Sequence, residues 1–379
     1  MSKGGRYARK KVKKPLGGVK IALIVVAVIL VLILALVIAA VSYYNSMLDL
    51  LQRPGEVSMP SMSDEELEAM LNNTVGLETT EATTEATTVP TTEATEPYEG
   101  QSPEEYITNI MLIGQAARQG EDYRISDTMM LCSINRKEKT LTLTSFQRDM
   151  RVVIPAYAGH TQGFNRMNFV YHLGSYYTGE VIGSMEMMAL CMEQNFGIKV
   201  DNTIEVDFEM FETVVNLLGG VDMEVTQAEI NYLQKNYDYF DDFTEGVNHL
   251  DGYQALCYAR IRKIDSDFNR TNRQRNLIME LLKKCIKLGV TELNGMMKEV
   301  LPMVTTDMSN EEITAYALEF IPMLSELEVK SQSVPFDGTW WSTDIGTEEQ
   351  PNYVIDCNLD KNKQMLLESI GMVETTEAE

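Results

Sequence analysis

Three short apolar segments predict β-strands in the middle of the chain. Their sequences are NIMLIG (109–114), TMMLCSI (128–134) and TLTLTSF (140–146). The first two are almost continuously apolar, which is typical of strands that are covered on both faces. We therefore expect these strands to lie inside a layered domain.

Helical periodicity follows the strands. Two groups of apolar residues recur every three or four positions, and the second group stops at a Gly-Gly pair. The segment VDMEV (221–225) then reads as a further strand. Strands mixed with covering helices predict an α/β fold, a layered α/β/α domain with a central mixed β-sheet. The two helical groups are Met185, Met188, Met192 and Phe196, and Phe208, Phe211, Val215 and Leu218.

One uncharged run near the N-terminus has the length of a membrane span. Ile21 to Val41 would form a helix of roughly 30 Å, the thickness of a bilayer core. Residues 1–20 hold eight Lys or Arg and no acidic residue, so the positive-inside rule predicts a basic cytoplasmic tail. We expect a transmembrane anchor over 21–42. A cleaved signal peptide ending near Ala40 is the alternative, although the run exceeds the usual apolar length of about 7–15 residues.

The segment after the anchor is rich in Thr and Glu. The tetrad TTEA occurs at 79–82, 83–86 and 91–94. Such a segment has too few large apolar residues to fold, so residues 43–101 are expected to form a disordered stalk and residues 373–379 a disordered tail. The remaining residues, 102–372, are expected to form the extracellular domain.

Charge and motif content exclude several classes of function. The net charge is -24, and the basic first twenty residues leave about -32 on the rest, so we expect no nucleic-acid partner. The five cysteines show no CxxC pair, which disfavours a zinc site or a disulfide framework. No HExxH, GxSxG or P-loop motif is present.

Against this acidic background, arginines gather in YARIRKIDSDFNRTNRQR (258–275). Asp251 and Gln254 form a possible capping box for a helix that leads to this stretch. Arg270, Arg273 and Gln274 fall on one helical stripe with apolar residues that must face the core, namely Leu277, Ile278, Leu281 and Leu282. The arginines are therefore expected at the rim of a cavity, where guanidinium groups and a helix N-terminus suit a phosphate. Alternatively, they pair with Asp265, Asp267 and other nearby acids in a solvated network.

Four spaced blocks resemble one family. ISDTMMLCSIN (125–135), TSFQRDMRVVIP (144–155), NRMNFVYHLG (165–174) and YARIR followed by DFNRTNRQ resemble, in this order, the signatures of the LytR-CpsA-Psr family of bacterial cell-wall enzymes. The resemblance extends over about residues 105 to 372.

The resemblance implies a phosphotransferase that joins a glycopolymer, of teichoic acid or capsule type, to peptidoglycan. The donor would be a polyprenyl-pyrophosphate carrier at the cytoplasmic membrane, and polyprenyl phosphate would be released outside the cell. Asp127 matches a magnesium ligand of the family, so Mg²⁺ is the implied cofactor. The implied catalytic residues are Asp127, Arg148, Asp149, Arg260 and Arg262, and the implied pyrophosphate site comprises Arg118, Arg148, Arg260, Arg262, Arg270, Arg273 and Gln274.

Two positions depart from the family pattern. Ala116 stands where the second metal-binding carboxylate belongs, and Ile125 replaces an arginine before Ser126. Either Glu121 or Asp122 substitutes, or Asp127 and phosphate oxygens hold magnesium alone. A third option is a weakly active or non-catalytic binder of the lipid pyrophosphate. Asp149 either orients arginines or assists the acceptor hydroxyl.

Overall fold

The structure is a computed structural model of the chain. It describes residues 46–54, 101–115, 125–285, 287–288, 290–320, 323, 326–346 and 351–373. The chain divides into two compact units, 1–49 and 50–379, and the central sheet with its covering helices belongs to the second unit. The expected anchor, 21–42, and most of the expected stalk lie outside the described residues. Within the described ranges, no helix combines the length and apolar character of a membrane span.

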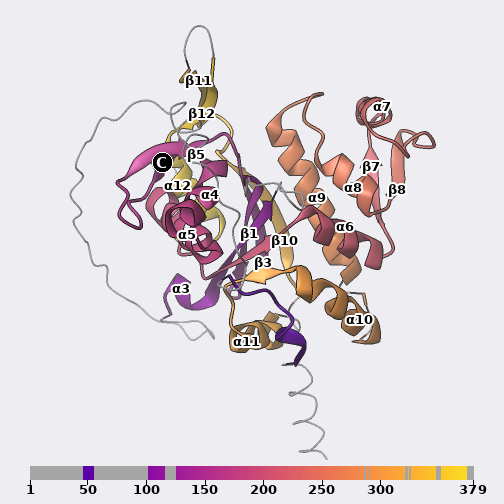
Figure 1. The fold of residues 1–379 in the computed structure, drawn as a ribbon, viewed down its shortest axis with the longest axis horizontal. Coiled ribbons are helices and arrows are strands. Elements are labelled where there is room, and N and C mark those ends of the chain that lie inside the picture. Colours follow the sequence, from indigo (N-terminus) through magenta and orange to yellow (C-terminus); the bar gives the residue numbers. More distant parts are fainter. Residues whose placement is uncertain are drawn as a thin grey trace, which may run out of the picture. The chain divides into compact units, whose positions relative to one another are not determined.

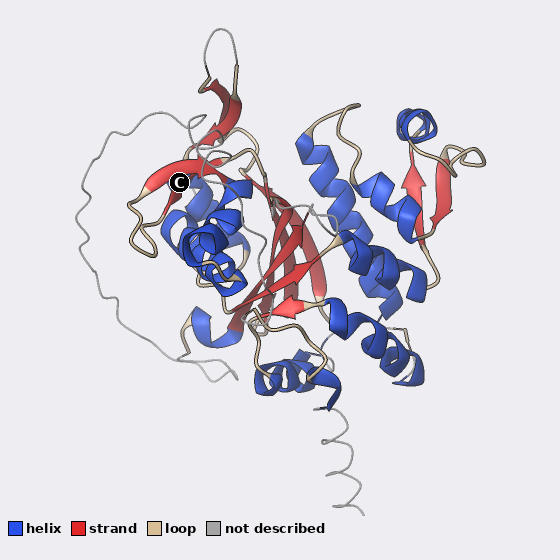
Figure 2. Ribbon diagram, in the orientation of Figure 1, coloured by secondary structure: helices blue, strands red, loops and turns tan. Residues whose placement is uncertain are grey.

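A mixed six-stranded sheet forms the centre of the second unit. The strand order is β10-β3-β2-β1-β6-β9, with parallel pairing of β10 with β3 and of β1 with β6, and antiparallel pairing elsewhere. This sheet confirms the expected central mixed sheet (Figures 1 and 2). The strands are β1 (Ile107–Gln115), β2 (Ser126–Asn135), β3 (Thr140–Phe146), β6 (Asn202–Val206), β9 (Thr305–Thr306) and β10 (Glu328–Val334).

The central strands are buried on both faces, as their apolar sequences indicate. In β2, Met129 and Leu131 pack into one core, whereas Met130 packs into another on the opposite face. Successive side chains of a strand point to opposite faces, so an uninterrupted apolar run is the expected sequence of such a strand. The prediction of two-sided burial is confirmed.

One face of the sheet is covered by α4 (Met167–Thr178), α5 (Val181–Phe196) and α12 (Leu359–Ser369). The helix predicted from its methionines is α5, in which Met185, Met188 and Met192 are buried. Helices α4 and α5 approach each other through Gly174, where a Cβ atom would lie 2.0 Å from the Gly183 carbonyl oxygen. This contact holds the two helices close together on the sheet (Figure 1).

On the other face lie α9 (Asp267–Cys285) and α11 (Asn310–Phe320). Helix α9 also contacts a second core, which is formed by α6, α7, α8 and the β7–β8 hairpin. Figure 2 shows these helices beyond the sheet, opposite α4 and α5. The bounds are α6 (Phe208–Leu217), β7 (Val221–Val225), α7 (Gln227–Asn236), β8 (Gly246–Leu250) and α8 (Gly252–Ala259).

The remaining elements are short. Two hairpin-like pairs, β4 with β5 and β11 with β12, lie outside the central sheet. The bounds are α3 (Pro103–Tyr106), β4 (Arg151–Ile154), β5 (Gly163–Arg166), α10 (Val290–Val300), a 3₁₀ turn (Leu301–Met303), β11 (Trp340–Asp344) and β12 (Tyr353–Cys357).

The structure differs from the expected stalk at residues 50–54. The backbone N–H of Gln52 donates to the Val304 carbonyl oxygen at 3.0 Å, and Gln52 pairs with Thr305 in a parallel bridge. The Arg53 guanidinium donates to the Met308 carbonyl and to the Asn310 side chain. This short contact could not be predicted from the composition of residues 43–101, because mostly polar and backbone groups make the contact.

His172 is expected to make the fold sensitive to acid. Its side chain is 3% exposed, neither ring nitrogen has a hydrogen-bond partner in the described part of the chain, and burial lowers its pKa. Below about pH 6.5 the His172 imidazole therefore binds a proton in the unfolded chain but not in the folded chain. The free energy of unfolding consequently falls as the pH falls. We expect a loss of up to about 1.4 kcal/mol per pH unit.

Chemical denaturation of the wild type and His172→Leu between pH 5 and 7 tests this expectation. The difference in unfolding free energy between the two proteins should change across that range. His160→Leu is the control, because His160 is exposed. An unchanged difference for His172→Leu would contradict the assignment.

Candidate active site

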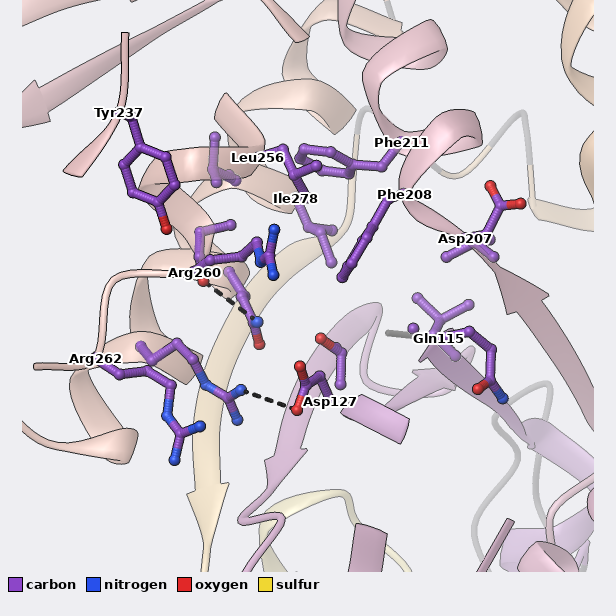
Figure 3. Close-up of a pocket in the computed structure, with 18 residues that line it drawn as sticks. Gln115, Asp127, Asp207, Phe208, Phe211, Tyr237, Leu256, Arg260, Arg262 and Ile278 are labelled. Carbon is purple, nitrogen blue, oxygen red and sulfur yellow. Dashed lines mark hydrogen bonds and ion pairs between the residues drawn. The ribbon is translucent and has the colours of Figure 1, made fainter. Parts of the chain in front are cut away.

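A cavity of about 270 Å³ lies between the sheet and the helices α6, α8 and α9. Strands β1, β2 and β6 supply one wall, and the three helices supply the other. Figure 3 shows that its lining is divided, with apolar and aromatic side chains at one end and charged groups at the other. The apolar end contains Phe208, Phe211, Leu256 and Ile278, and the charged end contains Asp127, Arg260 and Arg262. Arg270 also lines the cavity, 3.6 Å from Asp127.

The end of α8 places the first two arginines. The predicted capping box is present, because Asp251 accepts from the Gln254 N–H and Gln254 accepts from the Asp251 N–H. The helix therefore starts at a fixed residue and reaches its C-cap at Arg260. There the Arg260 guanidinium lies 4.8 Å from the centre of the Phe208 ring, a cation–π contact that joins the charged and apolar ends.

The first turn of α9 supplies the third arginine. Arg270 is 2% exposed, and its guanidinium donates to Asp267 at 3.0 Å and lies 3.6 Å from Asp127. Asp127 also accepts from Arg148 at 2.8 Å. The site thus contains a network in which carboxylates alternate with guanidinium groups.

Burial and local charge act differently on the two inner arginines. Burial lowers the pKa of Arg148, but Asp149, Asp127 and Asp267 outweigh burial and raise the pKa above its usual value. Burial lowers the pKa of Arg270, and here Asp267 and Asp127 do not fully compensate. The buried Nε–H of Arg270 also has no hydrogen-bond partner in the described part of the chain, so an additional negative charge, such as a phosphate, would stabilise this guanidinium.

Asp267 is a site residue that the sequence indicated only as a member of a solvated network. Its carboxylate lies 3.1 Å from the Arg262 guanidinium, 3.0 Å from that of Arg270 and 3.9 Å from that of Arg148. It is the first residue of α9, accepts a hydrogen bond from Arg270 and forms ion pairs with Arg262 and Arg148. Its position in the sequence, directly before the arginine stripe, could have identified Asp267 as a site residue.

The structure does not bring Arg273 to the cavity, contrary to the sequence-based placement. Its guanidinium donates to Glu229 at 2.5 Å and to the Ile261 carbonyl at 3.0 Å, and it also pairs with Asp265. Arg273 thus fastens α9 to α7 and to the loop after α8. The alternative expectation, that the arginines pair with nearby acidic residues, therefore applies to Arg273.

The other expected residues are distributed as follows. Gln274 lines the cavity, and its amide nitrogen lies 3.5 Å from the Ala259 carbonyl oxygen. Asp149 lies 3.4 Å from Arg148 and 3.7 Å from Arg166, which favours a role in orienting arginines. Arg118, Ala116 and the alternative ligands Glu121 and Asp122 lie outside the described residues.

The carboxylates of the cavity fit a magnesium ion only together with a phosphate. The described residues contain no cluster of three or more His, Cys, Asp or Glu that could hold a metal. Asp207 lines the cavity, but its carboxylate caps α6 by accepting from the Met210 N–H. Among the described residues of the cavity, Asp127 is then the available ligand, and Mg²⁺ is commonly bound by one or two carboxylates plus substrate phosphates.

An apolar cavity that ends in one buried and two partly exposed guanidinium groups defines a site for an amphiphile with an anionic, phosphate-like head. The chain matches the LytR_cpsA_psr family over residues 72–361. The protein therefore belongs to the LytR-CpsA-Psr family, as the four sequence blocks implied.

Two curated relatives and one solved structure are similar to the chain. It is 27% identical, over 66% of its own length and 75% of the relative's, to polyisoprenyl-teichoic acid–peptidoglycan teichoic acid transferase TagU of Oceanobacillus iheyensis. It is 34% identical to TagT of Bacillus subtilis, which carries the same transferase name, over 48% of this chain and 53% of TagT. A structure described as TagT bound to LIIa-WTA matches 72% of this chain and 94% of that one, with 25% identity and a TM-score of 0.55.

Proposed function

We propose that this protein is a phosphotransferase that joins a glycopolymer of teichoic acid type to peptidoglycan. The donor is a glycan on a polyprenyl-pyrophosphate carrier, and the second product is polyprenyl phosphate. One observation carries the proposal, namely the cavity in which an apolar end meets Asp127 and three arginines, Arg260, Arg262 and Arg270. Relatives that share this family are named as transferases of this kind.

The two ends of the cavity have separate tasks in this reaction. The apolar end, with Phe208, Phe211 and Ile278, holds the prenyl chain, since burial of each methylene group contributes about 0.8 kcal/mol. The guanidinium groups of Arg260, Arg262 and Arg270 bind the pyrophosphate through charge-assisted hydrogen bonds. The lipid is therefore held with its diphosphate beside Asp127 and Arg148.

Transfer requires an acceptor hydroxyl to attack the phosphorus that carries the glycan. The new P–O bond forms as the bridging P–O bond breaks, the hydroxyl proton is released, and polyprenyl phosphate leaves. Negative charge grows on the leaving phosphate, and fixed guanidinium groups stabilise this charge without reorganising. Arg270 and Arg148 are the arginines placed for this role, and Asp267 and Asp149 orient them.

Magnesium and membrane attachment are parts of the same proposal. Asp127 would hold Mg²⁺ together with the diphosphate, and the ion would supply further charge stabilisation. Residues 21–42 would anchor the chain once in the cell membrane, with the N-terminus in the cytoplasm and the folded domain outside. Apolar sequence and basic flank support this topology.

The test is a transfer assay with the purified full chain. The substrates are a short glycan on polyprenyl pyrophosphate and peptidoglycan fragments, and polyprenyl phosphate release and the joined product are followed with and without magnesium. We expect transfer by the wild type, stimulation by magnesium, and loss of that stimulation in Asp127→Asn. Binding of the lipid without any product would contradict the transferase and favour the non-catalytic alternative.

A further inference from the structure

The β11–β12 hairpin exposes large aromatic side chains. Trp340 is 38% exposed, Trp341 53% and Tyr353 61%. In Figure 1 the hairpin lies beside β5, away from α10 and α11. Exposed aromatic residues in such a group usually mark a binding surface rather than a stabilising feature.

The register of the hairpin divides these residues between its two faces. Trp340 pairs with Cys357, Ser342 with Ile355 and Asp344 with Tyr353. Side chains of directly opposed residues share a face, and successive residues alternate, so Trp340 and Tyr353 lie on the same face, with Ser342 between them and Asp344 beside Tyr353. Trp341 belongs to the opposite face. Trp340 and Tyr353 are therefore separated by roughly 13 Å along the strand.

The face of Trp340 continues directly into the active site. The Trp340 ring stacks on Phe268, with centroids 5.0 Å apart and planes at 25°. Phe268 follows Asp267, the carboxylate that holds Arg262 and Arg270. A surface made by this face would thus begin at the arginine network.

The hairpin is also joined to the Asp149 side of the site. The Ile355 N–H donates to the Asp149 carbonyl oxygen at 2.9 Å, and Arg166 donates to the Tyr353 carbonyl oxygen at 2.9 Å. Arg166 in turn lies 3.7 Å from the Asp149 carboxylate. The hairpin is held in a fixed position relative to the reacting groups.

The charge of the hairpin limits what can bind there. Residues 336–360 contain six Asp or Glu and no Lys or Arg, and of these acids Asp356 is paired with Arg151. This charge repels an anionic lipid surface and a polyanionic glycopolymer. A peptidoglycan sugar chain presents apolar C–H faces to aromatic rings and hydroxyls to Ser342 and Asp344, and with at most one carboxylate per disaccharide it is repelled much less than either.

We propose that Trp340 and Tyr353 form the subsite for the acceptor glycan of peptidoglycan and position its hydroxyl at the arginine network. The proposal rests on the proposed function and names the residues that select its acceptor. The lipid occupies the interior cavity, so the acceptor reaches the same phosphorus from the hairpin side.

Tryptophan fluorescence tests binding directly, because the chain contains only Trp340 and Trp341. Trp341→Phe leaves Trp340 as the sole reporter, and Trp340→Phe leaves Trp341 on the other face. The full chain in phosphatidylcholine nanodiscs is titrated with a soluble GlcNAc–MurNAc tetrasaccharide. We expect a saturable change for the Trp340 reporter and a much smaller one for the Trp341 reporter. The same proteins in phosphatidylglycerol nanodiscs, without saccharide, test a membrane contact.

Transfer kinetics separate positioning from a structural effect. We expect Trp340→Ala and Tyr353→Ala each to raise the acceptor KM about tenfold, the effect of losing one ring contact, with the donor KM unchanged. Trp341→Ala is the matched control and should retain the wild-type acceptor KM. Tyr353→Ala is included because it leaves the Trp340–Phe268 stack intact.

The outcomes are distinct. A saccharide response at Trp340 with raised acceptor KM supports the subsite. A response to anionic lipid but not to saccharide overturns it in favour of a membrane surface, and no response with unchanged KM overturns it outright. If the wild type fails to transfer but Trp340 responds to saccharide, the proposed function fails while a saccharide site remains.

Discussion

Arg270→Met is expected to lower kcat/KM for glycopolymer transfer by about 10²- to 10³-fold. The guanidinium is 2% exposed, faces the cavity beside Asp127, and has a pKa that burial lowers despite two neighbouring carboxylates. Its positive charge can therefore pair with a phosphate. This pairing is strongest in the transition state, when negative charge develops on the leaving phosphate. Single-turnover release of polyprenyl phosphate measures the effect.

Arg275→Met is the matched control for this prediction. Arg275 lies on the same helix, is 6% exposed, and donates to Ser331 and Ser333 on β10. Burial lowers its pKa to about 10, so it remains charged at neutral pH without contacting the cavity. We expect the control to change stability while the folded fraction keeps its kcat/KM. Equal losses of activity in both variants would show that Arg270 acts only through the packing of α9.

Arg273→Met is expected to lower the unfolding free energy by about 3–5 kcal/mol. The substitution leaves the Glu229 carboxylate buried and without the guanidinium that neutralises it, and it also removes the pairing with Asp265. Glu229 further belongs to the capping box of α7, so the loss extends to the start of that helix. Urea denaturation gives the magnitude.

The folded fraction of Arg273→Met should bind the lipid pyrophosphate with the wild-type Kd. Asp265→Asn, which removes a partially exposed partner and leaves Glu229 paired, should cost much less stability. If Arg273→Met kept normal stability but lost lipid binding, Arg273 would instead be a phosphate-binding residue, as its sequence position suggested.

The strands, the main helices and the inward direction of Arg270 could be predicted from the sequence because each depends on local periodicity. Arg148, Arg260 and Arg262 were expected at the site only from the family resemblance. The helix of Met185 to Phe196, the capping box at Asp251 and the inward direction of Arg270 are all present in the structure. Such features need only the spacing of apolar residues and the chemistry of helix ends.

The separation of Arg273 from Arg270 could not be predicted in this way. The single apolar stripe of α9 serves two cores, because Leu277 and Leu281 pack with α6 to α8, whereas Ile278 and Leu282 pack towards the sheet. Arg273 lies in the row of Leu277 and Leu281, and Arg270 lies in the row of Gln274 and Ile278. Only the tertiary arrangement shows that one row ends at Glu229 and the other at the cavity.

The position of α9 between two cores gives the cavity one firm wall and one compliant wall. Six residues of α9 are buried, including three arginines, whereas α6 contributes Phe208 and Phe211 to the cavity but buries only Val215. Movement of α6 therefore disrupts less packing than movement of α9. If the proposed function holds, we expect prenyl chains of different length to be accommodated by movement of α6, while the arginines of α9 keep one geometry towards the diphosphate.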